Sequence, residues 1–265
     1  MPTVIKIGIT VGAGMQSQGS QFDADYQAVL TYATTQGYTL PSASQQALQN
    51  QLVLDLKAGG VWNKLDTFAV FATDGNTDFA LIDWIRLTQY TAVNSPTFNT
   101  NEGFKGNGTS SYIDSNYAPS TMGVNYTLNN AGYGYYMRQY DTAPGIREGA
   151  WNASGGSQAI SWIRYPVKRV YLNSPISVYI NFTAQSNQFA AANRTNSTTV
   201  NLYSNGILQD TILINSFLLS NGTFRVFQVG SDYSDSQISM VYAGADLTTE
   251  QNNFYNAINT YLTSL

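Results

Sequence analysis

Short β-type runs separated by tight turns fill the chain from about Phe98 to Leu265. Clear runs rich in Val, Ile, Tyr and Phe occur at 176–180, 200–203 and 224–229, and Asn-Gly, Gly-Gly or Ser-Asn-Gly turns lie between such runs. These residue types favour strands, and an Asn-Gly pair between two strands favours a hairpin. Because no helical pattern separates the runs, they predict antiparallel strands in a β-sandwich or jelly roll.

Helical spacing of apolar residues occurs near both ends of the chain. The apolar positions of the first predicted helix are Phe22, Tyr26, Val29, Leu30 and Ala33, before Gly37. Those of the second, which Ser42 can cap, are Ala47, Leu48, Leu52 and Leu56. A last helix is predicted from Phe254, Ala257, Ile258, Tyr261 and Leu262. The first two helices form a hairpin whose apolar faces must be covered by the β domain or by a neighbouring subunit.

Three parts of the chain follow from these patterns. Residues 1–60 are predicted to be an arm and helical hairpin that dock the protein, 61–97 a connector with the first strands, and 98–265 a β-sandwich able to fold by itself. In the arm, Ile5, Ile7 and Ile9 alternate with other residues over 4–11, and a Gly/Ser/Gln-rich linker follows over 12–21. We expect the arm to join a sheet edge, either in its own chain or in a second copy.

The composition excludes several chemistries. The chain contains no histidine and no cysteine, which removes Ser-His-Asp triads, Cys nucleophiles, disulfides and Cys/His zinc sites. Charged residues make up 11%, against roughly 25% in an average soluble domain. The net charge of −4 gives no basic surface for nucleic acid. No apolar run approaches the ~20 residues of a membrane span.

Several segments resemble one superfamily. Residues 104–113, Phe-Lys-Gly-Asn-Gly-Thr-Ser-Ser-Tyr-Ile, are similar to its early F-G-G-x-x-Y-I strand, and 202–206, Leu-Tyr-Ser-Asn-Gly, to its Y-x-N-G hairpin. Residues 238–251 are similar to its closing strand and L-T-x-E helix, and Arg194 matches its a-x-R strand. This is the LamG-like branch of the concanavalin A-like lectins and glucanases. The resemblance implies a mostly β, jelly-roll (concanavalin A-like) sandwich, here with a short N-terminal helical hairpin and arm and a C-terminal helix.

A second resemblance concerns the segment 62–84 and residues 94–98 beyond it. They are similar to virion proteins of tailed phages of Bacteroidetes, including the crAss-like group, in which a comparable segment precedes the LamG-like sandwich. This resemblance implies location in the virion, as a head or tail decoration or fibre component. Other virion proteins and further copies of the chain would be its partners, with host surface glycans as a further binding partner.

The glycoside hydrolases of this superfamily carry an E-x-D-x-E-type strand that places two carboxylates on one face. The chain has no such strand, and Glu102, Glu148 and Glu250 are isolated. We therefore predict that the protein is not an enzyme.

Calcium is the one cofactor that lectin-like relatives make plausible. Asp74, Asn76 and Asp78 alternate as in a calcium loop, and Asp232 and Asp235 form a second acidic turn. The full twelve-residue loop fails because no glutamate follows at its end. Turn-forming preference explains Asp and Asn at both places equally well, so no cofactor is the leading expectation.

Aromatic and amide side chains suggest a sugar site. Sugar sites combine flat rings with a few oriented polar groups. The candidates are Tyr133, Tyr135, Trp151, Asn152 and Trp162. Strand alternation places Tyr133 and Tyr135 on one face and Tyr136 on the other, so core packing is the competing role for each ring.

The leading hypothesis is a phage virion structural protein that presents a lectin-like sandwich to host glycans. The alternatives are a free-standing carbohydrate-binding lectin, and a glycan hydrolase that depends on a pair of carboxylates.

Overall fold

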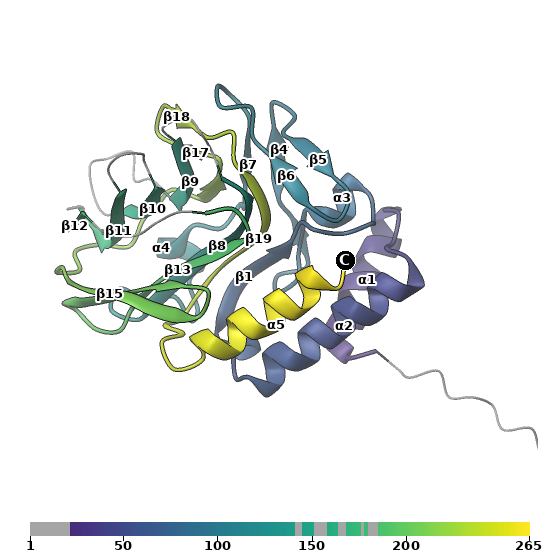
Figure 1. Cartoon of the computed structure of the whole chain (residues 1–265), viewed down its shortest axis with the longest axis horizontal. Helices are drawn as coiled ribbons and strands as arrows, with labels where there is room; N and C mark the ends of the chain where they lie inside the picture. Colours follow the sequence, from purple (N-terminus) through teal and green to yellow (C-terminus); the bar gives the residue numbers. More distant parts are fainter. Residues whose placement is uncertain (1–21, 141–144, 151–157, 164–167, 176–177, 180–184) are drawn as a thin grey trace, which may run out of the picture.

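The computed structural model describes residues 22–140, 145–150, 158–163, 168–175, 178–179 and 185–265. Within these ranges it describes the backbone alone for 145–150, 158–163, 168–169, 178–179 and Val229. Two antiparallel sheets face each other, and a layer of helices covers the outer face of the larger sheet (Figure 1). The mostly β sandwich predicted from the turn spacing is confirmed. In the described part of the chain, no helix is long and apolar enough to cross a bilayer.

The large sheet has eight strands, and its centre is β19 (Gln237–Gly244). One edge of β19 pairs with β8 (Ala131–Gln139). Its other edge pairs with β1 (Leu65–Val70) over one half and with β6 (Gly103–Lys105) over the other. The remaining strands are β13 (Gln188–Arg194), β14 (Thr199–Ser204) and β15 (Ile207–Leu213) beyond β8, and β5 (Thr97–Asn99) beyond β6.

The small sheet has seven strands. Their order is β12 (Val178–Tyr179), β11 (Lys168–Ser174), β10 (Gln158–Ile163), β9 (Gly145–Ala150), β16 (Phe224–Val226), β7 (Tyr112–Asp114) and β4 (Thr91–Val93). Two short pairs lie outside the sheets: β2 (Ile82–Asp83) with β3 (Thr88–Gln89), and β17 (Gln228–Val229) with β18 (Asp232–Tyr233). The short helices are η1 (Trp62–Lys64), α3 (Thr77–Ala80) and α4 (Pro119–Met122).

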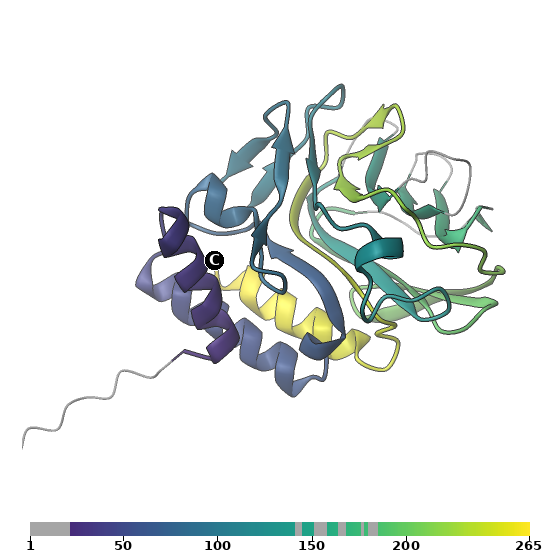
Figure 2. The same ribbon diagram turned by 180° about the vertical axis from the view of Figure 1, so that it is seen from behind.

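The long helices start and end where the sequence predicts. Asp23 caps α1 (Ala24–Gln36) by accepting a hydrogen bond from the Asp25 amide, and Gly37 ends it with a positive φ of 76°. Only glycine adopts that conformation without a steric penalty. Ser42 caps α2 (Ala43–Ala58), and α5 (Gln251–Thr263) closes the chain. Figure 2 shows the three helices side by side against the back of the large sheet. The predicted helical hairpin and C-terminal helix are confirmed.

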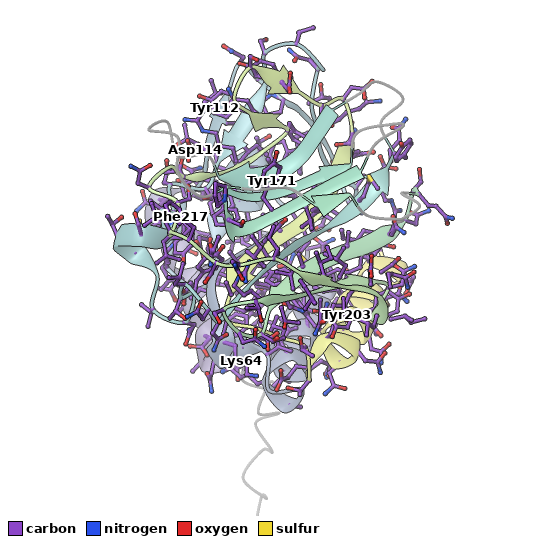
Figure 3. The ribbon with its side chains drawn as sticks, turned by 90° about the vertical axis from the view of Figure 1, so that its left-hand side faces the viewer. Lys64, Tyr112, Asp114, Tyr171, Tyr203 and Phe217 are labelled. Carbon is purple, nitrogen blue, oxygen red and sulfur yellow. The ribbon has the colours of Figure 1, made fainter. Side chains whose placement is uncertain are left out.

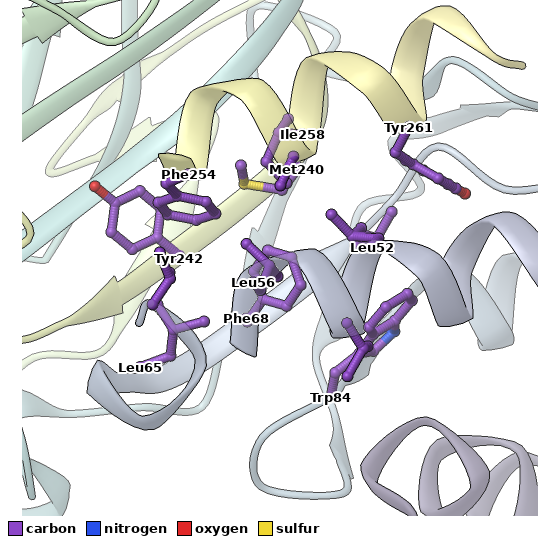
Figure 4. Packing of buried hydrophobic residues seen from close by; sticks show 14 of the residues in the cluster. Leu52, Leu56, Leu65, Phe68, Trp84, Met240, Tyr242, Phe254, Ile258 and Tyr261 are labelled. Carbon is purple, nitrogen blue, oxygen red and sulfur yellow. The ribbon is translucent and has the colours of Figure 1, made fainter. Parts of the chain in front are cut away.

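The chain's own sheet and terminal helix cover the apolar faces of the hairpin. Leu52 and Leu56 of α2 pack with Phe254 and Ile258 of α5 over Phe68 of β1 (Figure 4). The rings of Tyr242 and Phe254 meet edge to face, with centroids 4.6 Å apart. The hairpin is therefore part of the core, and its helices complete the large sheet rather than projecting from it. Contacts also cross residue 98 freely, because β1 lies in the middle of the sheet.

Alternation along the strands divides the core into two layers. Tyr133 and Tyr135 of β8 pack between the sheets, and Tyr136 packs against the helices. The shared face predicted for Tyr133 and Tyr135 is confirmed. Strands β1, β8 and β19 are buried on both faces over almost their whole length. Such double burial explains why their sequences lack the polar alternation of a half-exposed strand.

Two buried charged groups fix loops by hydrogen bonds to the backbone. Asp66 of β1 accepts hydrogen bonds from the Tyr117 hydroxyl at 2.9 Å and from the backbone amides of residues 124–126. Arg194 at the end of β13 is fully buried and donates to the carbonyl oxygens of Leu172 and Ile214 at 2.7–2.9 Å. Because Arg194 supplies several donors at once, it joins the ends of both sheets, and it has a structural role. Burial lowers the pKa of its guanidinium from the ordinary value.

Candidate ligand-binding face

The outer face of the small sheet is the sheet surface that the helices leave open. Along β7, Tyr112 and Asp114 are partly exposed on either side of the buried Ile113. Along β16, Arg225 is partly exposed between two buried residues. Tyr171 of β11 is likewise partly exposed between the buried Val170 and Leu172. These partly exposed side chains therefore share one face, which points away from the core.

Strand pairing places several of these residues in one row across the sheet. The successive register partners are Tyr171, Ile160, Gly149, Arg225, Asp114 and Thr91. With strands about 4.8 Å apart, five intervals span on the order of 24 Å. Gly149 brings no side chain to the middle of the row. Figure 3 shows the labelled Tyr112, Asp114 and Tyr171 on the same side of the molecule, above Lys64 and Tyr203.

Arg225 is held in place by partners on two strands, β7 and β17. Its Nε donates to Asp114 Oδ2 at 3.1 Å, and its Nη1 donates to Gln228 Oε1 at 2.7 Å. The guanidinium lies 4.9 Å from the centroid of the Tyr112 ring. Thr223 Oγ1 donates to the same Asp114 oxygen at 2.8 Å. The Arg225 side chain nevertheless keeps 38% of its surface exposed, so a ligand can reach a charged group whose orientation is already fixed.

This arrangement suits polar ligands with many hydroxyl or carboxylate oxygens. A planar guanidinium donates to such oxygens in a fixed geometry. Tyrosine rings offer flat apolar area together with a hydroxyl that donates and accepts. Tyr171 lies at the far end of the row from Asp114, so the face could contact an extended ligand at several points.

The structure separates the residues of the sugar site predicted from the sequence. Tyr133 and Tyr135 are completely buried, and in this conformation neither ring offers a face to a sugar. The backbone of Trp162 lies in β10 of the small sheet, paired with Arg169 of β11. Trp151 and Asn152 fall outside the described residues. The sequence therefore pointed to the small sheet through Trp162, while Tyr112, Tyr171 and Arg225 were missed. For Tyr171 and Arg225, the signal in the sequence was a single aromatic or charged residue between two apolar ones.

The acidic residues proposed for calcium have protein contacts typical of turns and caps. Asp74 Oδ1 accepts a hydrogen bond from the Ser42 amide at 3.0 Å, and Asn76 caps α3 by accepting from Phe79 N at 3.0 Å. Asp78 accepts from Asn76 Nδ2 at 3.4 Å. Asp232 is exposed in β18, and Asp235 follows that strand. Within the described ranges, no group of three or more acidic side chains could hold a metal ion. Calcium binding stays a prediction.

The isolated glutamates contact other polar side chains. Glu102 Oε2 accepts a hydrogen bond from Gln237 Nε2 at 3.2 Å, and Lys64 Nζ lies 2.7 Å from Glu250 Oε2. Although burial acts in the opposite direction, hydrogen bonds from Lys64 and Thr249 lower the pKa of Glu250. A catalytic general acid needs a raised pKa, which is the opposite of the direction found for Glu250. The side chain of Glu148 is outside the description.

Solved structures of the same architecture settle the fold. Domain 4 of AbnA, a GH43 extracellular arabinanase from Geobacillus stearothermophilus, in complex with arabinotriose, matches with a TM-score of 0.51 and 13% identity, over 72% of this chain and 98% of that domain. The chain shares the β-sandwich fold of this domain. The binding domain of botulinum neurotoxin DC in complex with rat synaptotagmin II matches with a TM-score of 0.54 and 15% identity, over 74% of this chain and 52% of that one.

A third similar structure is Trypanosoma rangeli sialidase in complex with 2,3-difluorosialic acid, with a TM-score of 0.51 and 11% identity, over 83% of this chain and 40% of that one. The chain thus spans about half of the toxin domain and two-fifths of the sialidase. No family model and no curated protein matches the sequence. At these identities the likeness establishes the sandwich fold alone. These structures leave the resemblance to phage virion proteins as a prediction.

Proposed function

We propose that the protein is a non-catalytic component of a bacteriophage particle that binds host surface glycans on the outer face of its small sheet. One observation carries the glycan-binding part. The helices cover the outer face of the large sheet, and the open sheet face presents Arg225 pre-oriented by Asp114, Gln228 and Tyr112. The AbnA domain, solved with arabinotriose, and the toxin binding domain, solved with synaptotagmin II, support a binding role for a sandwich of this kind.

The virion part rests on the sequence resemblance of residues 62–84 to phage virion proteins. The composition supports it, because a surface with 11% charged residues suits close packing between subunits, where buried charges would need partners. The absence of the E-x-D-x-E strand supports binding without hydrolysis.

The experiment measures binding of the full chain to arabinotriose and to a panel of bacterial surface polysaccharides by calorimetry. Arg225→Gln keeps the size of the side chain but removes its charge, and Tyr171→Ala removes a ring at the other end of the row. For a ligand that the wild type binds, we expect each change to weaken binding roughly tenfold or more, equivalent to about 1.4 kcal/mol.

Lys105→Gln and Tyr38→Ala serve as matched controls. Both residues are partly exposed and lie outside the small sheet. If the controls lose as much affinity as Arg225→Gln and Tyr171→Ala, the binding site lies elsewhere. The same conclusion follows if Arg225→Gln and Tyr171→Ala bind the ligand as tightly as the wild type. Release of reducing ends from a bound polysaccharide would contradict the non-catalytic assignment.

A further inference from the structure

The side-chain acceptors around Arg225 are already used within the protein. Asp114 Oδ2 accepts hydrogen bonds from Thr223 Oγ1 at 2.8 Å and from Arg225 Nε at 3.1 Å. The other oxygen, Asp114 Oδ1, accepts from the Asn116 amide at 2.9 Å, and 15% of the Asp114 side chain is exposed. Gln228 Oε1 accepts from Arg225 Nη1 at 2.7 Å. A ligand group that must donate hydrogen bonds therefore finds few side-chain acceptors here.

The groups that remain available at the same place are donors. Within the described part of the chain, neither Arg225 Nη2 nor the Tyr112 hydroxyl has a hydrogen-bond partner, although the guanidinium lies 4.9 Å from the centroid of the Tyr112 ring. The Tyr233 hydroxyl accepts from Gln228 Nε2 at 3.2 Å and keeps its own proton to donate. All three side chains that offer these donors are partly exposed.

The strands of the small sheet also carry more positive than negative residues, although the whole chain has a net charge of −4. Adjacent strands lie about 4.8 Å apart, within the screening length of about 8 Å at physiological ionic strength. Charges on one strand therefore contribute to the electrostatic potential at its neighbours. The positive residues of these strands are Arg147, Lys168, Arg169 and Arg225, and the negative ones are Asp114 and Glu148.

We infer that the ligand of this face is an acidic glycan, and that a carboxylate of one of its sugars accepts hydrogen bonds from Arg225 Nη2 and from the hydroxyls of Tyr112 and Tyr233. The inference rests on the glycan-binding role proposed above and names the class of glycan. An ionised carboxylate accepts several hydrogen bonds and donates none, which matches the donors that the site leaves available. Its bonds to a guanidinium are also stronger than those between neutral groups. A neutral sugar offers hydroxyls instead, and each of these brings a proton that needs an acceptor.

Matched pairs of ligands test the inference. Polygalacturonate, alginate and hyaluronan are each compared with their carboxyl-reduced forms, in which a primary alcohol replaces the carboxylate. Calorimetry with the full chain should show that at least one acidic polymer binds, and that its reduced form binds at least tenfold more weakly. Raising the salt concentration from about 0.05 M to about 0.5 M should weaken binding of the acidic form more than binding of the reduced form.

The same measurements separate this inference from the proposed function. A reduced form that binds as tightly as its acidic parent would overturn the inference, and so would the failure of all three acidic polymers to bind. The proposed glycan-binding function would survive either result if a neutral glycan such as arabinotriose binds to the same face. If no glycan of either class binds, both are wrong. Binding of a phosphate polymer alone, such as a wall teichoic acid, would show that the site takes phosphate rather than carboxylate.

Variants that each remove one donor test the residues. Tyr112→Phe and Tyr233→Phe keep the ring and remove the hydroxyl, and each should weaken binding of the acidic polymer about three- to tenfold. Arg225→Lys keeps the charge but not the planar group, so its affinity should lie between those of wild type and Arg225→Gln. Tyr38→Phe is the matched control, because Tyr38 is partly exposed and lies outside the small sheet, and it should bind like wild type.

The reduced polymer distinguishes a contact with the carboxylate from a general contribution to the binding face. Its weaker binding should change less than twofold in Tyr112→Phe, Tyr233→Phe and Arg225→Gln, because the group that these donors contact is missing. If the three variants weaken binding of the acidic and the reduced polymer by the same factor, the residues hold another part of the sugar, and the inference is wrong.

Discussion

At the scale of single residues, Asp66 connects the first strand of the large sheet with a loop about sixty positions later in the chain. Its carboxylate accepts from the Tyr117 hydroxyl and from the backbone amides of residues 124–126. One buried anion thus satisfies several donors that would otherwise be buried without acceptors.

Replacing Asp66 with Asn should destabilise the fold by about 2–3 kcal/mol. The amide group retains one acceptor oxygen, and its NH₂ group would face N–H donors. The free energy of unfolding in urea measures the effect. Asp232→Asn is the matched control, because Asp232 is exposed, and we expect a change within about 0.5 kcal/mol. Equal stability of Asp66→Asn and wild type would mean that water replaces the carboxylate contacts.

Because of Asp23, the stability of the fold should depend on pH in the acid range. The hydrogen bond from Lys57 of α2 lowers the pKa of Asp23 below its ordinary value of 3.8. Because the folded pKa lies below the unfolded one, the stabilisation is present above pH 3.8 and is lost as the pH falls through the folded pKa. Asn caps helices as well as Asp does, so Asp23→Asn isolates the charge.

The melting temperature of wild type should therefore exceed that of Asp23→Asn at pH 6, and the difference should shrink as the pH falls below about 4. A difference that stays constant over this range would show that the charge of Asp23 does not contribute to stability.

The sequence predicted which face of β8 each tyrosine occupies, but it did not predict exposure. Alternation requires that Tyr133 and Tyr135 share a face. Whether that face meets water depends on a second sheet made from residues far away in the sequence. Arg225 could not be recognised for the converse reason, since its partners Asp114 and Tyr112 lie more than a hundred positions earlier.

At the scale of elements, α5 is the helix whose sequence pattern is most directly reproduced in the structure. Phe254, Ala257, Ile258, Tyr261 and Leu262 are all buried against α2 and the large sheet. The Tyr261 hydroxyl donates to the Ala72 carbonyl at 2.7 Å, which adds a polar contact that spacing alone does not predict.

Replacing Ile258 with Asp should cost several kcal/mol, because it buries an unpaired charge among apolar side chains. Thermal melting followed by circular dichroism measures the loss. Asn252→Asp is the control, since Asn252 is exposed in the first turn of α5, where a carboxylate is favoured. A wild-type melting temperature for Ile258→Asp would mean that α5 can detach without loss of the sandwich.

The position of β1 could not be predicted from its own residues. Its run of apolar residues indicates a strand buried on both faces, but a short run does not specify a partner. The partner is β19, which lies at the other end of the chain, from Leu65 opposite Gly244 to Val70 opposite Met240. Local turn chemistry identified the hairpin β14–β15, in which Asn205 and Gly206 have positive φ, because its strands are adjacent in sequence.

At the scale of the whole molecule, the pairing of β1 with β19 leads to a different expectation for residues 98–265 from the independent folding predicted from the sequence. Such a fragment lacks β1 and both N-terminal helices, so one edge of β19 and the apolar rings of Tyr242 and Phe254 would face water. We expect the fragment to aggregate or to bind a hydrophobic dye without a cooperative melt. The full chain is the control and should show a single transition. A cooperative melt of the fragment would show that residues 98–265 fold as an independent domain.

The pairing of β1 with β19 also determines when the protein can fold during its synthesis. The ribosome produces β1 early and β19 almost last, and translation at about 5–20 residues per second separates them by roughly 10–35 s. During that interval the nascent chain holds a strand that has apolar side chains on both faces and no partner. The cell must keep this strand from other chains until the C-terminus emerges, so slower translation or a shortage of chaperones should reduce the yield of protein before it reduces the stability of any molecule that has folded.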